Sequence, residues 1–214
     1  NNYLSEFTDE EKQRLEQKQL PPALDLIHDD FRTHTLEDSS IDAIITDPPY
    51  PQEFLPLWDD LSDFALRVLK PSGFLVTYSG QYHLPYIYET LSRNLMYFWT
   101  FAIYLPGSTM LVNNIGVMNA WKPILVYQKP PFKKMEYTAY DMVISPNSEK
   151  ALHDWQQSEG GVKKLIEYFT KEGDLVLDPF SGAGTFAKVA YEMKRRAIGI
   201  EVDKNTHLRA VNRI

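Results

Sequence analysis

The tetrapeptide Asp47-Pro48-Pro49-Tyr50 places an acid, a rigid turn and an aromatic ring side by side. Two consecutive prolines lack N–H donors and fix both φ angles, so their carbonyl oxygens can accept hydrogen bonds from another molecule. A carboxylate and a carbonyl oxygen suit an exocyclic amino group, and Tyr50 can stack on the ring that carries it. The tetrapeptide therefore suits a flat heterocycle with an amine, although a turn that ends a strand with a surface tyrosine would also explain it.

A second candidate site lies far downstream, in the glycine-rich segment 178–185, Asp-Pro-Phe-Ser-Gly-Ala-Gly-Thr. It follows the strand-like run 174–177 and precedes the helix-like run 186–193. Glycines between a strand and a helix let the backbone approach a nucleotide closely. The next apolar run, 197–200, ends in Glu201, 23 residues beyond Asp178. An acid at about this distance typically holds a ribose diol.

Both sites need strands to position them, and the sequence predicts an alternation of strands and helices. The expected strands are 24–28, 41–46, 74–78, 95–104, 121–127, 174–177 and 197–200. The expected helices begin near Thr8, run from about 54 to 70, and cover 86–94, 161–169, 186–193 and 203–214. This pattern predicts an α/β, doubly wound fold with a mixed, mostly parallel sheet and its sites at the carboxyl ends of the strands.

Together the two motifs resemble the amino-methyltransferases of nucleic acids, which use S-adenosyl-L-methionine to methylate exocyclic amines. The resemblance covers the chain from about residue 24 to its end and implies a Rossmann-like methyltransferase fold. The catalytic motif precedes the cofactor motif, an order that looks like the circularly permuted β class. The loop 79–85 is similar to loops in members carried by phages and mobile elements.

The resemblance implies catalytic roles for Asp47, Pro48, Pro49 and Tyr50. It also implies a set of residues that contact S-adenosyl-L-methionine: Asp30, Gln157, Ser158, Asp178, Pro179, Phe180, Ser181, Gly182, Gly184, Thr185 and Glu201. Asp30 corresponds to the acid that contacts the adenine amino group of the cofactor, with Asp29 in place of the usual glycine. A plain solvated acid pair is the alternative for these two residues.

Gln157 and Ser158 precede the predicted helix 161–169, whose start faces the cofactor carboxylate in the β class. The N–H groups of a helix start suit an anion. His153 is a weaker candidate, because the usual His-Pro and Lys-Pro pairs of the family are absent.

Residues 1–22 are expected to form an N-terminal arm or helix, and 23–214 the catalytic domain with a small recognition insertion around 105–120 and 129–150. A net charge of −7 argues against a surface that grips phosphate everywhere. The connector 105–120 and Lys129, Lys133 and Lys134 are therefore the candidate surface for nucleic acid, although a solvated loop explains them equally well.

In the loop 79–85, Gln81 and His83 could touch the substrate, but a role in the turn is the simpler explanation.

The chain has no cysteine, which fits a reducing cytoplasm and excludes a thiolate metal site. No metal is expected. No apolar run reaches 18 residues, so no membrane span is indicated.

The predicted function is methylation of adenine N6 in DNA, with the base extruded from the helix. Cytosine N4 is the nearest alternative; members acting on cytosine more often carry serine where this chain has Asp47. A cofactor-binding subunit that serves a partner, or a homodimer, remains open. A nicotinamide-dependent dehydrogenase would explain Gly182, Gly184 and Glu201 but leaves the Asp47 motif unused.

Overall fold

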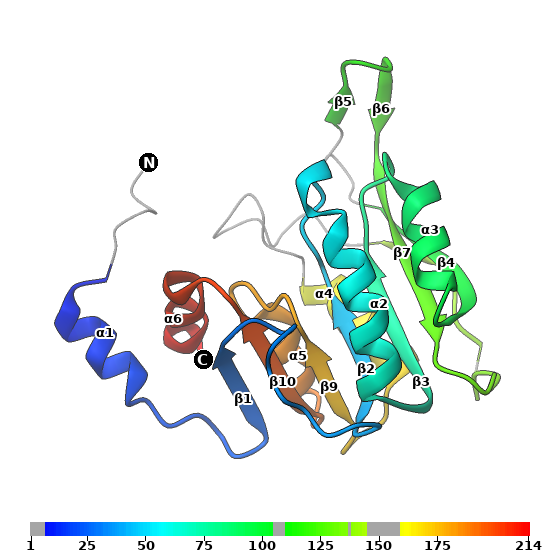
Figure 1. Cartoon of the computed structure of the whole chain (residues 1–214). Helices are drawn as coiled ribbons and strands as arrows, with labels where there is room; N and C mark the ends of the chain where they lie inside the picture. The colour runs from blue at the N-terminus through cyan, green and yellow to red at the C-terminus, as the bar shows by residue number, and fades with distance from the viewer. Residues whose placement is uncertain (1–6, 105–109, 137, 145–158) are drawn as a thin grey trace.

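The centre of the protein is a mixed, eight-stranded sheet, seen in a computed structural model that describes residues 7–104, 110–136, 138–144 and 159–214 (Figure 1). In spatial order the strands are β1 (Leu24–His28), β10 (Arg196–Glu201), β9 (Leu175–Asp178), β2 (Ile41–Thr46), β3 (Leu69–Tyr78), β7 (Trp121–Gln128), β4 (Met96–Tyr104) and β8 (Met142–Ile144). The first five strands are parallel, and β7 is antiparallel to both of its neighbours. The predicted fold class is confirmed.

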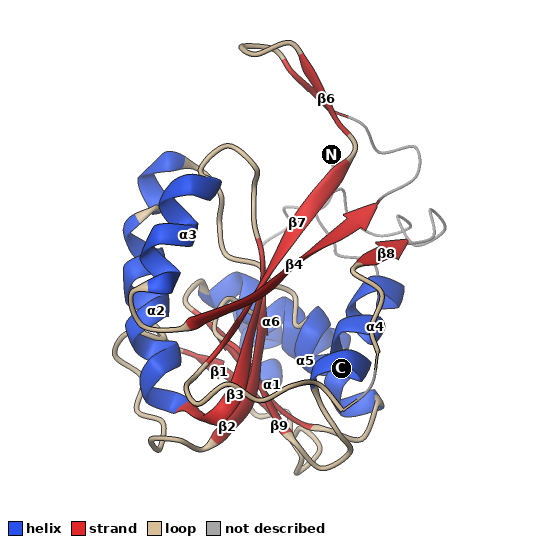
Figure 2. Cartoon of the chain, turned by 90° about the vertical axis from the view of Figure 1, so that its right-hand side faces the viewer, coloured by secondary structure: helices blue, strands red, loops and turns tan. Residues whose placement is uncertain are grey.

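Helices cover both faces of the sheet (Figure 2). One face packs against α4 (Glu159–Phe169) and α5 (Thr185–Glu192), and the other against α2 (Pro56–Val68) and α3 (Leu84–Ser92). The alternation along β2 explains this double burial, because Ala43 and Ile45 point into the first core and Ile44 into the second.

The sheet has a switch point between β9 and β2. α5 follows β9 and α2 follows β2, and these two helices lie on opposite faces of the sheet. The backbone pairing between the two strands ends at Ile44 and Leu177, before the carboxyl end of either strand. In open α/β sheets such a crevice at the carboxyl ends is where ligands bind.

The first and last helices lie at the β1 edge. α6 (Lys204–Arg213) packs Leu208 and Val211 against Leu15 of α1 (Asp9–Glu16), whose N-cap is Thr8. β1 pairs with β10, so the first strand of the domain lies beside its last strand. Within the described residues no helix is long and apolar enough to cross a bilayer.

Three parts of the predicted element list were wrong. The connector 105–120 was expected to be a loop, but its described part is a hairpin of β5 (Met110–Val112) and β6 (Val117–Asn119), which projects from the sheet (Figure 1). α2 ends at Val68, and residues 69–73 already belong to β3 through an irregular start where Ser72 has φ 64°. The edge strand β8 was not predicted. A short helical turn, η1 (Gln52–Phe54), precedes α2.

Candidate active site

Four acids that the sequence singled out lie at one edge of the sheet. Asp47 directly follows β2, Asp178 ends β9, Glu201 ends β10, and Asp30 comes two residues after β1. These strands are adjacent and parallel, so their carboxyl ends share an edge. The fold therefore brings the amine-binding motif and the glycine-rich loop together across the crevice.

The tetrapeptide 47–50 holds its own acid and ring together. The Tyr50 hydroxyl donates a hydrogen bond to Oδ1 of Asp47, and the Lys122 ammonium lies 5.2 Å from the centre of the Tyr50 ring. Burial, and then the charge of Asp47, raise the pKa of Tyr50 well above its usual value, so this hydroxyl stays a donor. Pro48 is buried, while Pro49 is partly exposed.

Tyr78, the last residue of β3, was not identified from the sequence. Its hydroxyl is buried and has no hydrogen-bond partner among the described residues. Burial, and then the charge of Asp47, raise the pKa of Tyr78. An unpaired buried hydroxyl is costly unless a ligand or water meets it. Its strand pattern is that of an ordinary core tyrosine, so no sequence signal distinguishes it.

The loop 178–185 has the backbone geometry of a ligand-binding turn. Gly182 and Gly184 have φ of 49° and 77°, in the left-handed region where glycine is strongly preferred. A side chain at Gly182 would meet no atom of the described structure within 4 Å, so this part of the loop faces open space. Gly184 is the N-cap of α5, whose first N–H groups lie at the same edge.

The loop is held from behind by packing and backbone contacts. Ser181 is buried and donates its N–H to the carbonyl of Ile200, and a side chain at Gly199 would approach Ser181 Cβ to 2.9 Å. The Phe180 ring packs on Phe31 with centroids 4.9 Å apart. Pro179, which directly precedes Phe180, is buried.

Glu201 is fixed by backbone donors. Its Oε2 accepts from the N–H of Gly182 and its Oε1 from the N–H of Asp203, both at 2.8 Å. A carboxylate can accept about four hydrogen bonds, so two more acceptor positions exist for the hydroxyls of a ribose.

Asp178 is a buried acid at this edge of the sheet, and its pKa is raised. Burial raises its pKa to about 7, and the charges of Asp47 and Glu201 add to the effect, while hydrogen bonds from Thr46 and the Phe180 N–H oppose it. Its Oδ2 is buried without a partner among the described residues. An unpaired carboxylate oxygen beside an open glycine loop fits the ammonium group of a methionine-like ligand.

Thr185 differs from the expected role. Its hydroxyl is buried and accepts a hydrogen bond from Arg213 at 2.8 Å, and Arg213 also pairs with Glu159 at 3.1 Å. The side chain of Thr185 therefore ties α6 to the loop, and a contact with the cofactor would come from its backbone.

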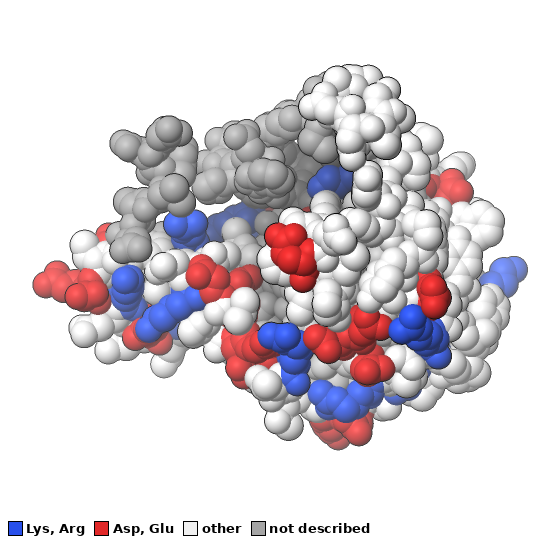
Figure 3. Space-filling model, turned by 45° about the horizontal axis from the view of Figure 1, so that its top comes forward, with Lys and Arg blue, Asp and Glu red and all other residues white. Residues whose placement is uncertain are grey.

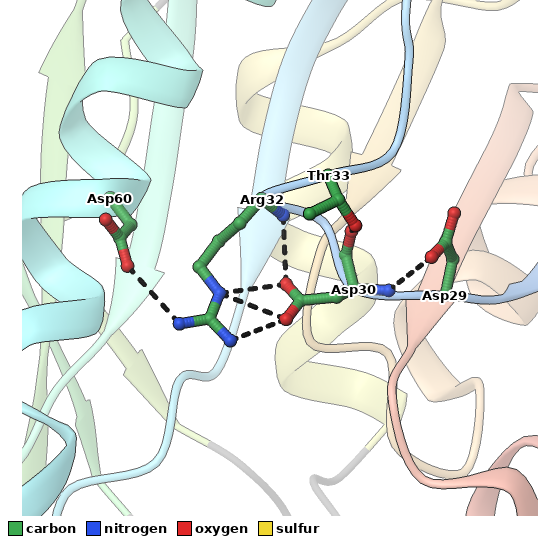
Figure 4. A network of polar contacts seen from close by, with 5 residues as sticks. All are labelled: Asp29, Asp30, Arg32, Thr33 and Asp60. Carbon is green, nitrogen blue, oxygen red and sulfur yellow. Dashed lines mark hydrogen bonds and ion pairs between the residues drawn. The ribbon is translucent and has the colours of Figure 1, made fainter.

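Asp30 also has a partner within the chain. Arg32 binds both of its carboxylate oxygens and reaches Asp60 at 3.7 Å, while Asp29 accepts from the Asp30 N–H (Figure 4). The Arg32 guanidinium holds the pKa of Asp30 below its usual value. Asp30 stays ionised and in place at the end of β1, but a contact with an adenine amine would have to share the carboxylate with Arg32.

Gln157 and Ser158, together with His153, lie outside the described residues. The loop 79–83 is described, and there Gln81 donates to the side chain of Asn119 at 3.1 Å and to the carbonyl of Trp121 at 2.9 Å. Gln81 thus anchors the base of the β5–β6 hairpin at the carboxyl end of β3.

The lysines that were grouped with this hairpin lie at the opposite end of the strands, where β3 begins and β7 ends. The Lys129 ammonium donates to the carbonyl of Leu69, where β3 begins, and Lys133 donates its N–H to Gln128, where β7 ends. β7 has eight residues, so about 25 Å of strand separates these lysines from the hairpin at its other end. Lys133 and Lys134 line a cavity of about 480 Å³ there, which none of the predicted site residues line. The expectation that these lysines share one surface with the connector was therefore wrong.

Where described residues form the face seen in Figure 3, acidic and basic side chains are interspersed and form no continuous basic surface. Residues 110–121, which include the hairpin, contain no charged side chain. No cluster of three or more potential metal ligands occurs in the described part of the chain.

Comparison with known proteins agrees with this geometry. The family model N6_N4_Mtase, described as DNA methylase, matches residues 41–212. The type II methyltransferase M.HpaI of Haemophilus parainfluenzae is 30% identical over 79% of this chain and 66% of its own length, so the chain spans just under two thirds of that relative.

Two solved structures show the same fold. The complex of M1.HpyAVI with S-adenosyl-L-methionine (SAM) has a TM-score of 0.73 and 25% identity, and covers 88% of this chain and 98% of its own. The cytosine-N4-specific PvuII DNA methyltransferase has a TM-score of 0.71 and 19% identity over 84% and 82% of the two chains. SAM is the cofactor of this family. The chain belongs to the N6_N4_Mtase family of DNA methylases, the SAM-dependent amino-methyltransferases of adenine N6 and cytosine N4.

Proposed function

We propose that this protein transfers a methyl group from SAM to the exocyclic N6 of adenine in DNA. The observation that carries the proposal is the hydrogen bond between Thr46 and Asp178, 2.7 Å long, which joins the strand that presents Asp47 to the strand that presents the glycine-rich loop. An amine-binding motif and a cofactor-binding loop separated by more than a hundred residues thus meet at one crevice.

The cofactor side of the proposed site consists of the loop 178–185 and Glu201. The unpaired Oδ2 of Asp178 fits an ammonium group, the open face of Gly182 admits a ligand, and Glu201 is positioned for a ribose diol. When bound, SAM supplies an activated methyl group on a sulfonium, so the protein needs mainly to orient the acceptor. Asp30 would contact the adenine of the cofactor, and Gln157 and Ser158 its carboxylate end.

The substrate side consists of Asp47, Pro48, Pro49 and Tyr50. The Asp47 carboxylate and the Pro48 carbonyl accept hydrogen bonds from the amine and aim its lone pair at the methyl group, while Tyr50 and Pro49 fix the plane of the base. The Tyr50 hydroxyl already bonds Asp47, so the acid and the ring are set relative to each other before the base arrives. Asp47 also accepts the proton that the amine releases, or passes it to water.

Adenine is favoured over cytosine because an acid occupies position 47, where the members that act on cytosine more often have serine. A base inside a duplex cannot reach this crevice, so it must be extruded. The likeness to the PvuII enzyme concerns the fold and does not bear on the choice of base.

DNA would approach from the carboxyl edge of the sheet. The β5–β6 hairpin stands beside this edge and is anchored by Gln81, so we place the recognition insertion of the domain 23–214 there, with 1–22 as an arm. The net charge of −7 leaves room for a partner subunit or a second copy of the chain to supply basic contacts. A DNA substrate and the absence of cysteine favour the cytoplasm.

Identification of the product tests this function. The protein is incubated with isotopically labelled SAM and separate samples of duplex DNA, single-stranded DNA and RNA, and the released nucleosides are identified by mass. Labelled N6-methyl-2′-deoxyadenosine from DNA only is the expected result. Labelled N4-methyl-2′-deoxycytidine would overturn the choice of base, and absence of label in every sample, with SAM bound, would favour a non-catalytic subunit.

A further inference from the structure

The ends of the catalytic strand and the cofactor strand are not joined by backbone pairing. The last pair between β2 and β9 is Ile44 with Leu177. Thr46 and Asp178 therefore extend past the ladder, into the crevice where the proposed substrates meet. Direct contact between these two strand ends is therefore made by side chains.

One side-chain hydrogen bond spans this gap. Thr46 Oγ1 donates to Oδ1 of Asp178 at 2.7 Å, and the two residues are 0% and 1% exposed. Oδ1 also accepts from the Phe180 N–H at 3.2 Å, whereas Oδ2 is buried without a partner among the described residues. The Thr46 bond thus fixes the rotation of the carboxyl group and leaves Oδ2 as the oxygen presented to a ligand.

We propose that Thr46 is a positioning residue that couples occupancy of the cofactor loop to the placement of Asp47. The inference rests on the proposed function, since it concerns the same site. Thr46 directly precedes Asp47, so a displacement of its backbone moves the catalytic carboxylate. A cation at Oδ2 favours the ionised form of Asp178, and a carboxylate accepts a stronger bond from the Thr46 hydroxyl than a neutral acid does.

The coupling has an electrostatic signature that can be measured. The charged groups that face Asp178 are Asp47, after β2, and Glu201, at the end of β10; both disfavour its ionisation, as burial does. The Thr46 hydroxyl and the Phe180 N–H act in the opposite direction. Removal of the hydroxyl should therefore raise the pKa of Asp178 further.

Three variants isolate the hydroxyl. Thr46→Val removes it at nearly constant volume, Thr46→Ser keeps it, and Thr46→Ala removes it without the risk of overpacking if the valine variant does not fold. Thr77→Val is the matched control, because Thr77 is the register neighbour of Thr46 in β3, is equally buried, and bonds only the carbonyl of Tyr78 in the described structure.

We expect Thr46→Val to lower kcat at saturating SAM by about tenfold, because this is the effect of losing one hydrogen bond to a charged acceptor. Thr46→Ser should stay within about threefold of the parent, and Thr77→Val likewise. A loss that serine does not restore, or one that Thr77→Val reproduces, would show a general effect on the sheet and overturn the proposal.

The second measurement is the pH midpoint of SAM affinity, obtained by calorimetry between about pH 5.5 and 8.5, a range around the pKa of Asp178. Affinity should rise as Asp178 ionises, and the midpoint should move up by about one pH unit in Thr46→Val. An unchanged midpoint overturns the coupling. If the parent binds SAM but does not methylate, the proposed function fails. The shift of this midpoint in Thr46→Val still tests whether Thr46 controls the ionisation of Asp178. The pH dependence of unfolding without SAM reports the same carboxyl, independently of any activity.

Discussion

The Oε2 oxygen of Glu201 accepts a hydrogen bond from the backbone N–H of Gly182 at 2.8 Å, which ties the end of β10 to the open turn of the glycine-rich loop. The second oxygen is held by the N–H of Asp203 at the same distance. The acid is therefore oriented before any ligand binds, and little side-chain entropy remains to be lost on binding.

Glu201→Ala should weaken SAM binding by roughly 1.5–3 kcal/mol, because charge-assisted hydrogen bonds to the ribose and the support of Gly182 are lost together. Calorimetry at constant ionic strength measures the effect. Glu201→Gln is the control, since it keeps an acceptor for Gly182 and should lose less. Equal affinity in the alanine variant and the parent would remove Glu201 from the site.

The raised pKa of Asp178 leads us to expect an unusual dependence of folding stability on pH. The carboxyl has a pKa of about 7 in the folded chain and about 3.8 when unfolded, so between these values the folded state binds the extra proton. Its contribution to stability is thus present below about pH 4 and is lost as pH rises through 7. Asp178→Asn should therefore gain stability relative to the parent as pH increases from 5 to 8, measured by urea unfolding without SAM. A stability difference that is constant over this range would contradict the raised pKa.

Arg213 should support the loop from the C-terminal helix. It donates to Thr185 and pairs with Glu159, and its side chain is 22% exposed. Arg213→Ala should lower the free energy of unfolding by about 1–2 kcal/mol and weaken SAM binding, because two partners lose their contacts. Arg209→Ala, one turn earlier on α6, is the matched control and should have the smaller effect in both measurements. Equal effects of the two variants would mean that only helix packing is involved.

The β5–β6 hairpin should contribute to DNA binding, and the lysines at the other edge should not. Gln81→Ala removes two hydrogen bonds that anchor the hairpin and should weaken DNA binding about fivefold without changing SAM affinity. The double variant Lys133→Ala, Lys134→Ala should keep both the affinity and its salt slope. Fluorescence anisotropy over a range of salt concentrations measures the DNA affinity of both variants. A weaker salt dependence of DNA binding in the lysine variant would show that Lys133 and Lys134 contact DNA.

The sequence sufficed for the framework because strands and turns leave local signals. Asp47, Asp178 and Glu201 each end an apolar run, and parallel strands bring such ends to one edge, so their proximity followed from pattern alone. The hairpin was missed because strands of three residues are too short to show a period. The bulged start of β3 was missed because Pro71 and Gly73 normally mark a turn.

The contacts that tune the site could not be predicted, since they join residues distant in sequence. Thr46 meets Asp178 across the switch point, and Arg213 at the end of α6 reaches Thr185 at the start of α5. The position of Lys129 was not predicted for the same reason. Its partners are the carbonyls at the end of α2 and the start of β3, about 60 residues earlier in the chain. The roles assigned to Gln157 and Ser158 stay predictions.

The most direct test of the account is the single-turnover rate of methyl transfer by Asp47→Ala at saturating SAM and DNA. Asp47 acts mainly in the transition state, where the amine nitrogen gains positive charge, so the rate should fall by far more than tenfold while calorimetry shows SAM affinity close to that of the parent. Asp47→Asn, which keeps an acceptor oxygen, should retain more activity than alanine. Methylation of adenine by Asp47→Ala within about tenfold of the parent rate would amount to less than roughly 1.4 kcal/mol of barrier, which contradicts a catalytic role for this carboxylate.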